Sequence, residues 1–142
     1  MLKNKIDKII ELKETMIRNK EREIEDATIE IKKIVLNMHM VEETIHKSHN
    51  SLGAVTMKGS DFSVLKDYII FLEKRKEALI GEKREKEERI NGLRLQLFEL
   101  AKEKKMFQKL KSKIAAGIKK SYNRKQQKLL DDIALRVDAR LH

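Results

Sequence analysis

The first third of the chain carries a regular apolar repeat. From Lys3 to Leu52 two positions in each seven-residue repeat are apolar, at alternating spacings of three and four. This pattern is typical of a helix that packs along one seam of a coiled coil. It predicts a helix over about residues 2–52. The seam positions are Ile6, Ile10, Ile17, Ile24, Ala27, Ile31, Ile34, Met38, Val41, Ile45 and Leu52, and the interruptions are Lys3, Lys13, Lys20 and Ser48.

The second half of the chain keeps the same spacing. It predicts a second helix over about residues 61–139. Lysines interrupt this seam as well, and a lysine can lay its methylenes on a seam while its ammonium group reaches water. The apolar positions are Leu65, Ile69, Leu72, Leu79, Ile90, Leu93, Leu97, Leu100, Phe107, Ile114 and Ile118, and the lysines are Lys76, Lys83, Lys86, Lys104 and Lys111.

The helical pattern stops only between Ser51 and Asp61. Gly53 and Gly59 bracket this stretch, and glycines are typical of a connection between helices. Ser60 or Asp61 is suited to be the N-cap of the helix that follows, because its side-chain oxygen can accept backbone N–H bonds. We therefore expect a tip over about residues 53–60.

Folding the chain at this tip aligns the two seams. Ile45 then faces Ile69, and most seam lysines face an apolar residue. Lys3 opposite Lys111 is the exception, a like-charge pair at the open end. The predicted fold is all-α: a single domain over residues 1–142, built as a two-helix antiparallel coiled-coil hairpin.

This register leaves the second helix longer than the first. Residues 112–142 are expected to form a one-helix overhang of roughly 45 Å at 1.5 Å per residue. Its apolar stripe has a phase slip around residues 121–126 and no partner within the molecule, which is typical of a binding surface or of a segment that frays in isolation. The stripe consists of Ile114, Ile118, Leu129, Leu130, Ile133, Val137 and Leu141.

Composition supports long helices rather than a globular core. The 142 residues are 39% charged and 4% aromatic, with no proline, tryptophan or cysteine. The absence of cysteine suits a reducing compartment. No apolar run approaches the roughly 20 residues that span a bilayer, and the N-terminus does not resemble a signal peptide. We expect a cytoplasmic protein that does not itself cross a membrane.

Positive charge gathers in residues 102–128, which we call the basic segment. It holds eleven basic residues and one acid, Glu103, a balance that equals the net charge of +10 for the whole chain. Such a segment can bind nucleic acid, because lysines neutralise phosphates with little need for geometry. The segment has few aromatic and arginine side chains to stack on bases or read their edges, however. A solvated helix face explains it better, and no nucleic-acid partner is expected.

Enzymatic chemistry finds no support in the sequence. There is no glycine-rich phosphate loop, no cysteine and no strand scaffold for a catalytic constellation. His39, His46 and His49 lie on one stretch of helix near Glu42 and Glu43, but they are off the seam and are best explained as solvated side chains. We expect no enzymatic activity, no cofactor and no metal. A generic coiled-coil spacer or scaffold explains the heptads but leaves the overhang and the basic segment unexplained, and it stays an alternative.

Two short stretches carry a resemblance to a known family. The segment Asn123-Arg-Lys-Gln-Gln127-Lys-Leu-Leu-Asp-Asp132-Ile-Ala-Leu-Arg136 resembles the C-terminal signature of the FliJ/YscO family, the type III export proteins of flagella and injectisomes. That signature is a Gln-Lys pair, an acidic pair, then an alanine and an arginine. Tyr68-Ile-Ile-Phe71-Leu-Glu-Lys, which follows Gly59, is similar to the aromatic and aliphatic stretch after the turn in that family.

The resemblance implies a central stalk that inserts its N- and C-terminal end into a hexameric export ATPase, promotes its assembly or activity, and links it to the export gate at the membrane. Export chaperones are further implied partners. Carried over by residue, with the apolar anchors of the same face added, the ATPase-binding set is Arg124, Gln127, Lys128, Leu130, Asp131, Asp132, Ile133, Ala134, Arg136 and Val137. The set near the gate is Tyr68, Phe71 and Leu72, although our register buries Leu72 against Val41.

The implied location is the cytoplasm, in peripheral association with the inner-membrane export apparatus. The flagellar system is preferred, and an injectisome stays open. The alternatives from a different class also stay open: a generic spacer or scaffold and, after it, a basic coiled coil that binds nucleic acid.

Overall fold

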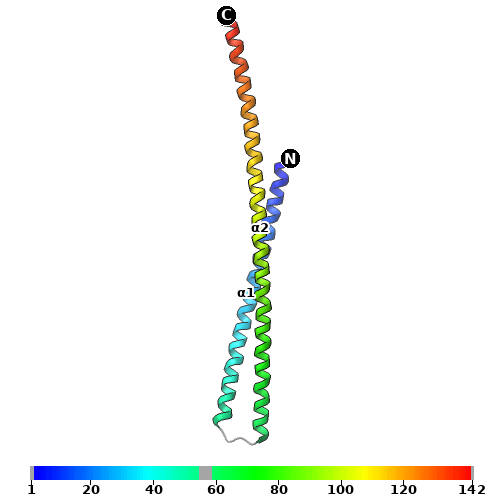
Figure 1. The fold of residues 1–142 in the computed structure, drawn as a ribbon, viewed down its shortest axis with the longest axis vertical. Coiled ribbons are helices and arrows are strands. Elements are labelled where there is room, and N and C mark those ends of the chain that lie inside the picture. Colours follow the sequence, from blue (N-terminus) through cyan, green and yellow to red (C-terminus); the bar gives the residue numbers. More distant parts are fainter. Residues whose placement is uncertain (1, 55–58, 142) are drawn as a thin grey trace. The chain divides into compact units, whose positions relative to one another are not determined.

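The chain forms two long helices that pack against each other (Figure 1). The computed structural model describes residues 2–54 and 59–141. Helix α1 is Leu2–Ala54, with 53 residues, and helix α2 is Gly59–Leu141, with 83 residues. The all-α prediction is confirmed over these residues. Both helices are continuous through the segments in which the heptad pattern predicts them.

The helix ends differ slightly from the prediction. α1 continues through Gly53 to Ala54, and α2 already begins at Gly59. Ser60 and Asp61 therefore lie in the first turn of α2 rather than before it, where the Asp61 carboxylate faces the positive end of the helix dipole. Residues 55–58 of the predicted tip lie outside the described residues, as does the side chain of Leu141.

Contacts divide the helices into two compact units. The terminal unit is Met1–Ile17 with Glu99–His142, and the middle unit is Arg18–Phe98. Each unit contains a stretch of α1 and a stretch of α2. Within each unit the packing is explained by the seam residues of both helices.

Every buried hydrophobic residue in the described part of the chain occupies a predicted seam position. The most buried is Leu79, with 1% of its surface exposed. Ser48, predicted as an interruption of the seam, is buried as well. The buried set is Ile6, Ile10 and Leu100 in the terminal unit, and Ala27, Ile34, Ile69, Leu72, Leu79, Ile90 and Leu93 in the middle unit.

Lysines that interrupt the seams of the terminal unit reach carboxylates on the other helix. Lys13 Nζ lies 2.6 Å from Glu103 Oε2, and Lys104 Nζ lies 3.4 Å from Glu14 Oε1. Lys111 Nζ lies 2.5 Å from Asp7 Oδ1, one helical turn from Lys3, so Lys111 has a carboxylate partner at the end where the register places two like charges. A lysine whose stem packs on a seam thus ends on an opposite charge and not in water alone.

Seam lysines of the middle unit also form ion pairs with carboxylates on the other helix. Lys86 Nζ lies 2.6 Å from Glu30 Oε2, and Lys76 Nζ lies 3.2 Å from Glu42 Oε1. Asp7 pairs with Lys111 and Glu14 with Lys104, and Glu30 pairs with Lys86 and Glu42 with Lys76, so within each unit the later residue of α1 pairs with the earlier residue of α2. Lys20 and Lys83 are different, because their ammonium groups pair with Glu23 and Glu87 on their own helices.

The Lys86 ammonium group holds the pKa of Glu30 below its usual value, through a hydrogen bond and its charge. A carboxyl with a lowered folded-state pKa adds stability above its unfolded pKa, and this contribution is lost as the pH falls through the folded pKa. We expect Glu30→Gln to lower the midpoint of urea unfolding slightly at pH 7, and to have no effect once the pH is low enough to protonate Glu30. Glu25 is an exposed acid on the same helix, and Glu25→Gln is the control. It should leave the midpoint of urea unfolding unchanged both at pH 7 and at low pH. An effect of Glu30→Gln that persists in acid would contradict the ion-pair explanation.

Gly81 and Gly92 lie in exposed positions inside α2. A Cβ added to Gly81 or Gly92 meets no atom within 4 Å, and neither residue has a positive φ. Glycine in a helix interior is less favourable than alanine by about 1 kcal/mol. We therefore expect Gly81→Ala and Gly92→Ala each to raise the free energy of unfolding by about 1 kcal/mol in chemical denaturation. A decrease for either variant would mean that the position is not a regular, open helical site.

Candidate partner-binding surface

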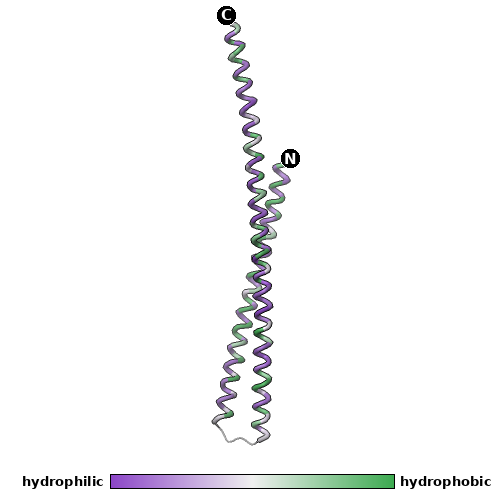
Figure 2. The backbone as a smooth tube through the Cα atoms, in the orientation of Figure 1, coloured by the Kyte–Doolittle hydropathy of each residue, from purple (hydrophilic) through white to green (hydrophobic). Residues whose placement is uncertain are grey.

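The part of α2 from Ala115 to Asp138, together with Ala139, has no buried side chain. We call residues 115–139 the exposed segment, and it belongs to the terminal unit. The last half-buried residue of α2 before it is Ile114, whereas Ile118, which the heptads place on the seam, is 61% exposed. Hydrophobic positions still recur along this stretch (Figure 2). The large exposed apolar side chains are Ile118, Tyr122, Leu129, Leu130, Ile133, Leu135 and Val137.

Three apolar positions of the exposed segment share a helix face, whereas Leu135 lies on the opposite side. Leu130, Ile133 and Val137 follow one another at spacings of three and four, which places them one above another. Leu130 is 58% exposed and Ile133 48% exposed, so each can lose apolar surface to a partner. These are the three apolar residues that the sequence assigned to ATPase binding.

The polar residues of the predicted set lie on a different face. Arg124, Lys128 and Asp131 follow one another at spacings of four and three, so they also stack. At 100° per residue, this stack lies roughly opposite the stack of Leu130, Ile133 and Val137. The structure therefore brings the predicted residues onto one exposed segment but distributes them around the helix.

Two side-chain hydrogen bonds order the polar part of this segment. The Gln127 amide donates from Nε2 to Asp131 Oδ1 at 3.1 Å, within the predicted set. The Gln126 amide donates from Nε2 to the Tyr122 hydroxyl at 2.8 Å, where the apolar stripe changes phase. Asp132, Ala134 and Arg136 are exposed. Neither Asp132 nor Arg136 forms an ion pair with another residue that the structure describes.

The residues assigned to the export gate divide into two kinds. Tyr68 and Phe71 are 45% and 63% exposed on α2 of the middle unit. Leu72 is 7% exposed and belongs to the core, so it offers no surface to a partner. Val64, one turn before Tyr68, extends the exposed apolar face, and sequence reasoning missed it. Its spacing of four residues to Tyr68 and seven to Phe71 is the signal that could have found it.

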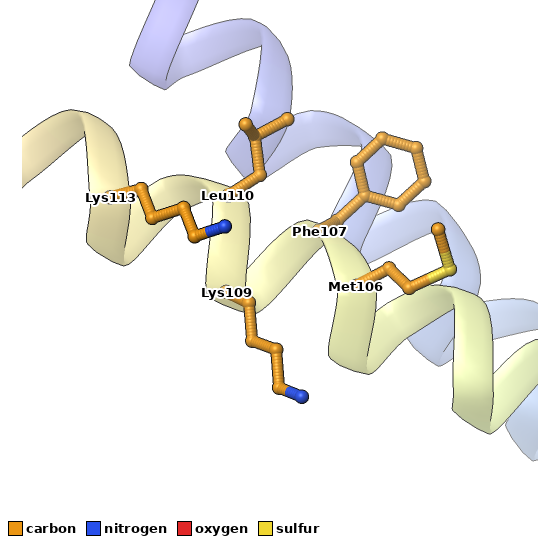
Figure 3. Close-up of a pocket in the computed structure, with 5 residues that line it drawn as sticks. All are labelled: Met106, Phe107, Lys109, Leu110 and Lys113. Carbon is orange, nitrogen blue, oxygen red and sulfur yellow. The ribbon is translucent and has the colours of Figure 1, made fainter.

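A shallow groove in the terminal unit was also missed. It has a volume of about 370 Å³ and is lined by Met106, Phe107, Lys109, Leu110 and Lys113. Figure 3 shows Met106, Phe107 and Leu110 projecting to the same side of α2, with Lys109 pointing away from them. The heptads explain only Phe107, which is a seam position. The others lie outside the seam, where the repeat carries no information about grooves.

The histidines do not come together. His39 Nδ1 lies 3.9 Å from Glu42 Oε2 on its own helix, and His49 Nε2 lies 3.9 Å from Glu73 Oε1. Among the residues that the structure describes, no group of three or more histidine, cysteine or acidic side chains is placed to hold a metal ion.

Neither of the two described helices contains a stretch long and apolar enough to cross a membrane. Comparison of the chain with protein-family models, with curated protein sequences and with solved structures found no match.

Proposed function

We propose that this chain is the central stalk of a bacterial type III protein export apparatus, a coupling protein without enzymatic activity of its own. In this proposal its N- and C-terminal end inserts into the hexameric export ATPase and promotes its assembly or activity. The other end approaches the cytoplasmic part of the export gate. The system is flagellar by preference, and an injectisome is the alternative. The protein then resides in the cytoplasm, in peripheral association with the inner-membrane apparatus, with export chaperones as further partners.

The proposed architecture is an antiparallel coiled coil in which helix α2 extends beyond α1. The cross-helix ion pairs support it, because Asp7 with Lys111 and Glu14 with Lys104 run in opposite directions along the two helices. In the middle unit the pair of Glu30 with Lys86 follows the same order. The exposed segment then corresponds to the overhang, a single helix that no other described part of the chain covers.

The observation that carries the proposal is the distribution of the C-terminal motif around the exposed segment. Apolar Leu130 and Ile133 lie on one face, and Arg124, Lys128 and Asp131 lie on the other. A partner that contacts only one side of this helix leaves half of these residues unused. A ring that encloses the helix can use all of them. The motif resemblance and the enclosing geometry thus favour the same kind of partner, the pore of a hexamer.

The exposed aromatic face near the start of α2 supplies the second contact in this proposal. Val64, Tyr68 and Phe71 form a face suited to an apolar patch on the gate, since aromatic side chains are frequent anchors of interfaces. Leu72 supports that face from the core and does not contact the gate. A spacer protein would need neither this face nor the exposed segment, which is why we place the generic scaffold second.

The test is ATP hydrolysis by the partner hexamer, titrated with this protein. We expect Leu130→Ala combined with Ile133→Ala to weaken binding to the hexamer by about 3 kcal/mol, because both side chains act as buried anchors in the complex. The concentration needed for half-maximal stimulation should then rise roughly 100-fold. Deletion of Gln126–His142 should abolish stimulation. The melting temperature of the isolated double variant should stay unchanged, since both side chains are already exposed.

Leu36→Ala combined with Met40→Ala is the matched control. These residues are 61% and 58% exposed on α1 of the middle unit, so the control removes a similar exposed apolar area away from the exposed segment. It should stimulate like the wild type. If the truncated protein stimulates hydrolysis as well as the full chain does, the stalk proposal is wrong for this end of the molecule.

A further inference from the structure

A stripe of cations follows one side of α2 in the terminal unit. Its members recur at spacings of three, four, four, seven and four residues, which keeps them on one face of a helix. All of them are exposed. At 1.5 Å per residue the stripe is roughly 33 Å long. We call it the cationic stripe, and its members are Lys102, Lys105, Lys109, Lys113, Lys120 and Arg124.

No member of the cationic stripe has an ion-pair partner among the residues that the structure describes. Other lysines of the basic segment contrast with it, because Lys104 and Lys111 end on Glu14 and Asp7 of α1. The sequence has no acid between Lys104 and Lys128, so only Lys102, near Glu99 and Glu103, has an acid of its own helix close by. The positive charge is therefore uncompensated, and it faces away from the helix pair. It fits a partner that presents many negative charges.

Apolar side chains lie directly beside the cationic stripe. Met106 is 64% exposed and Leu110 44% exposed, and both line the groove that Lys109 and Lys113 border (Figure 3). Lysines mixed with exposed apolar side chains are typical of helices that lie at a membrane surface, where the apolar groups enter the boundary between headgroups and acyl chains. Charge attraction and apolar contact thus act on adjacent faces of the helix.

The chemistry of the cations favours a fluid surface over a folded acidic partner. Ten of the eleven basic residues in the basic segment are lysines. Lysine is a flexible point charge, whereas fixed carboxylates are recognised better by the planar arginine fork, which binds them in a bidentate manner. A plane of mobile phosphates can meet every member of a linear stripe at once. A folded protein would have to place its acids at matching intervals over the same length.

We propose that the cationic stripe, with Met106 and Leu110, is a docking surface for a bilayer rich in anionic phospholipids. The stripe neutralises the headgroup phosphates, and the two apolar side chains enter the interface. The helix lies on the membrane and does not cross it. This inference does not depend on the proposed export function, since it rests on the charge, the exposure and the apolar neighbours of the stripe. Arg124 belongs to both surfaces, so the ATPase and the bilayer would compete for it.

The experiment is sedimentation of the full-length protein with vesicles at low and at high salt. Vesicles containing one-third phosphatidylglycerol should bind the protein, and vesicles of phosphatidylcholine alone should not. Lys102→Gln combined with Lys109→Gln and Lys113→Gln should weaken binding about 100-fold, because each basic residue near an anionic surface contributes roughly a factor of five. Met106→Ser combined with Leu110→Ser should remove the part of the binding that persists at high salt.

A control of equal charge separates a local site from net charge. Lys32→Gln combined with Lys66→Gln and Lys74→Gln changes the same number of exposed lysines in the middle unit. It should weaken vesicle binding less than threefold. Equal losses in the two triple variants would overturn the site, as would the absence of binding to anionic vesicles. Binding of a single-stranded oligonucleotide, or of an acidic protein, in place of the vesicles would overturn the lipid assignment.

Discussion

Pairing of seam lysines with carboxylates on the other helix is the interaction that lets this sequence form a helix pair. The buried apolar set is small, and lysines interrupt both seams. A cation held in a seam without a partner is costly, because burial removes part of its hydration. Lys13, Lys86, Lys104 and Lys111 each end on a carboxylate of the opposite helix. These pairs are partly exposed, and pairs of this kind contribute at most about 1 kcal/mol each. Their main effect is to make the interruptions tolerable while the apolar layers supply the stability.

The sequence predicted the core well because the heptad repeat and burial describe the same geometry. All buried apolar residues, from Ile6 to Leu100, lie at positions that the repeat selects. The partners of the lysines were not predicted, because the repeat gives the facing residue and not the carboxylate that a long side chain can reach from it. The N-cap was assigned to Ser60 or Asp61 on local preference alone, and α2 begins at Gly59. Helix ends depend on weaker forces than helix interiors.

The candidate site was predictable in part for a similar reason. The heptads predicted that the apolar stripe after Ile114 has no partner within the molecule. Residues 115–139 are exposed in the structure. The motif could not separate surface from core, so Leu72 was included although it is buried. The period of a helix already places Leu130 and Ile133 on the face opposite Arg124 and Asp131. This arrangement became meaningful only once the structure showed that the side chains of residues 115–139 are exposed. The groove beside Leu110 depends on side-chain placement, which no periodicity encodes.

The central claim is that the two units pair their helices through the seam while residues 115–139 stay an uncovered helix. Amide hydrogen exchange of the isolated protein, resolved by segment, tests it most directly. An uncovered helix lacks tertiary packing and opens readily, whereas amides beneath the packed seams open only with the unit. The account predicts strong protection around Ile10, Leu79 and Leu100, and rapid exchange throughout residues 115–139. Protection of residues 115–139 equal to that around Leu79, in the protein alone, would contradict it.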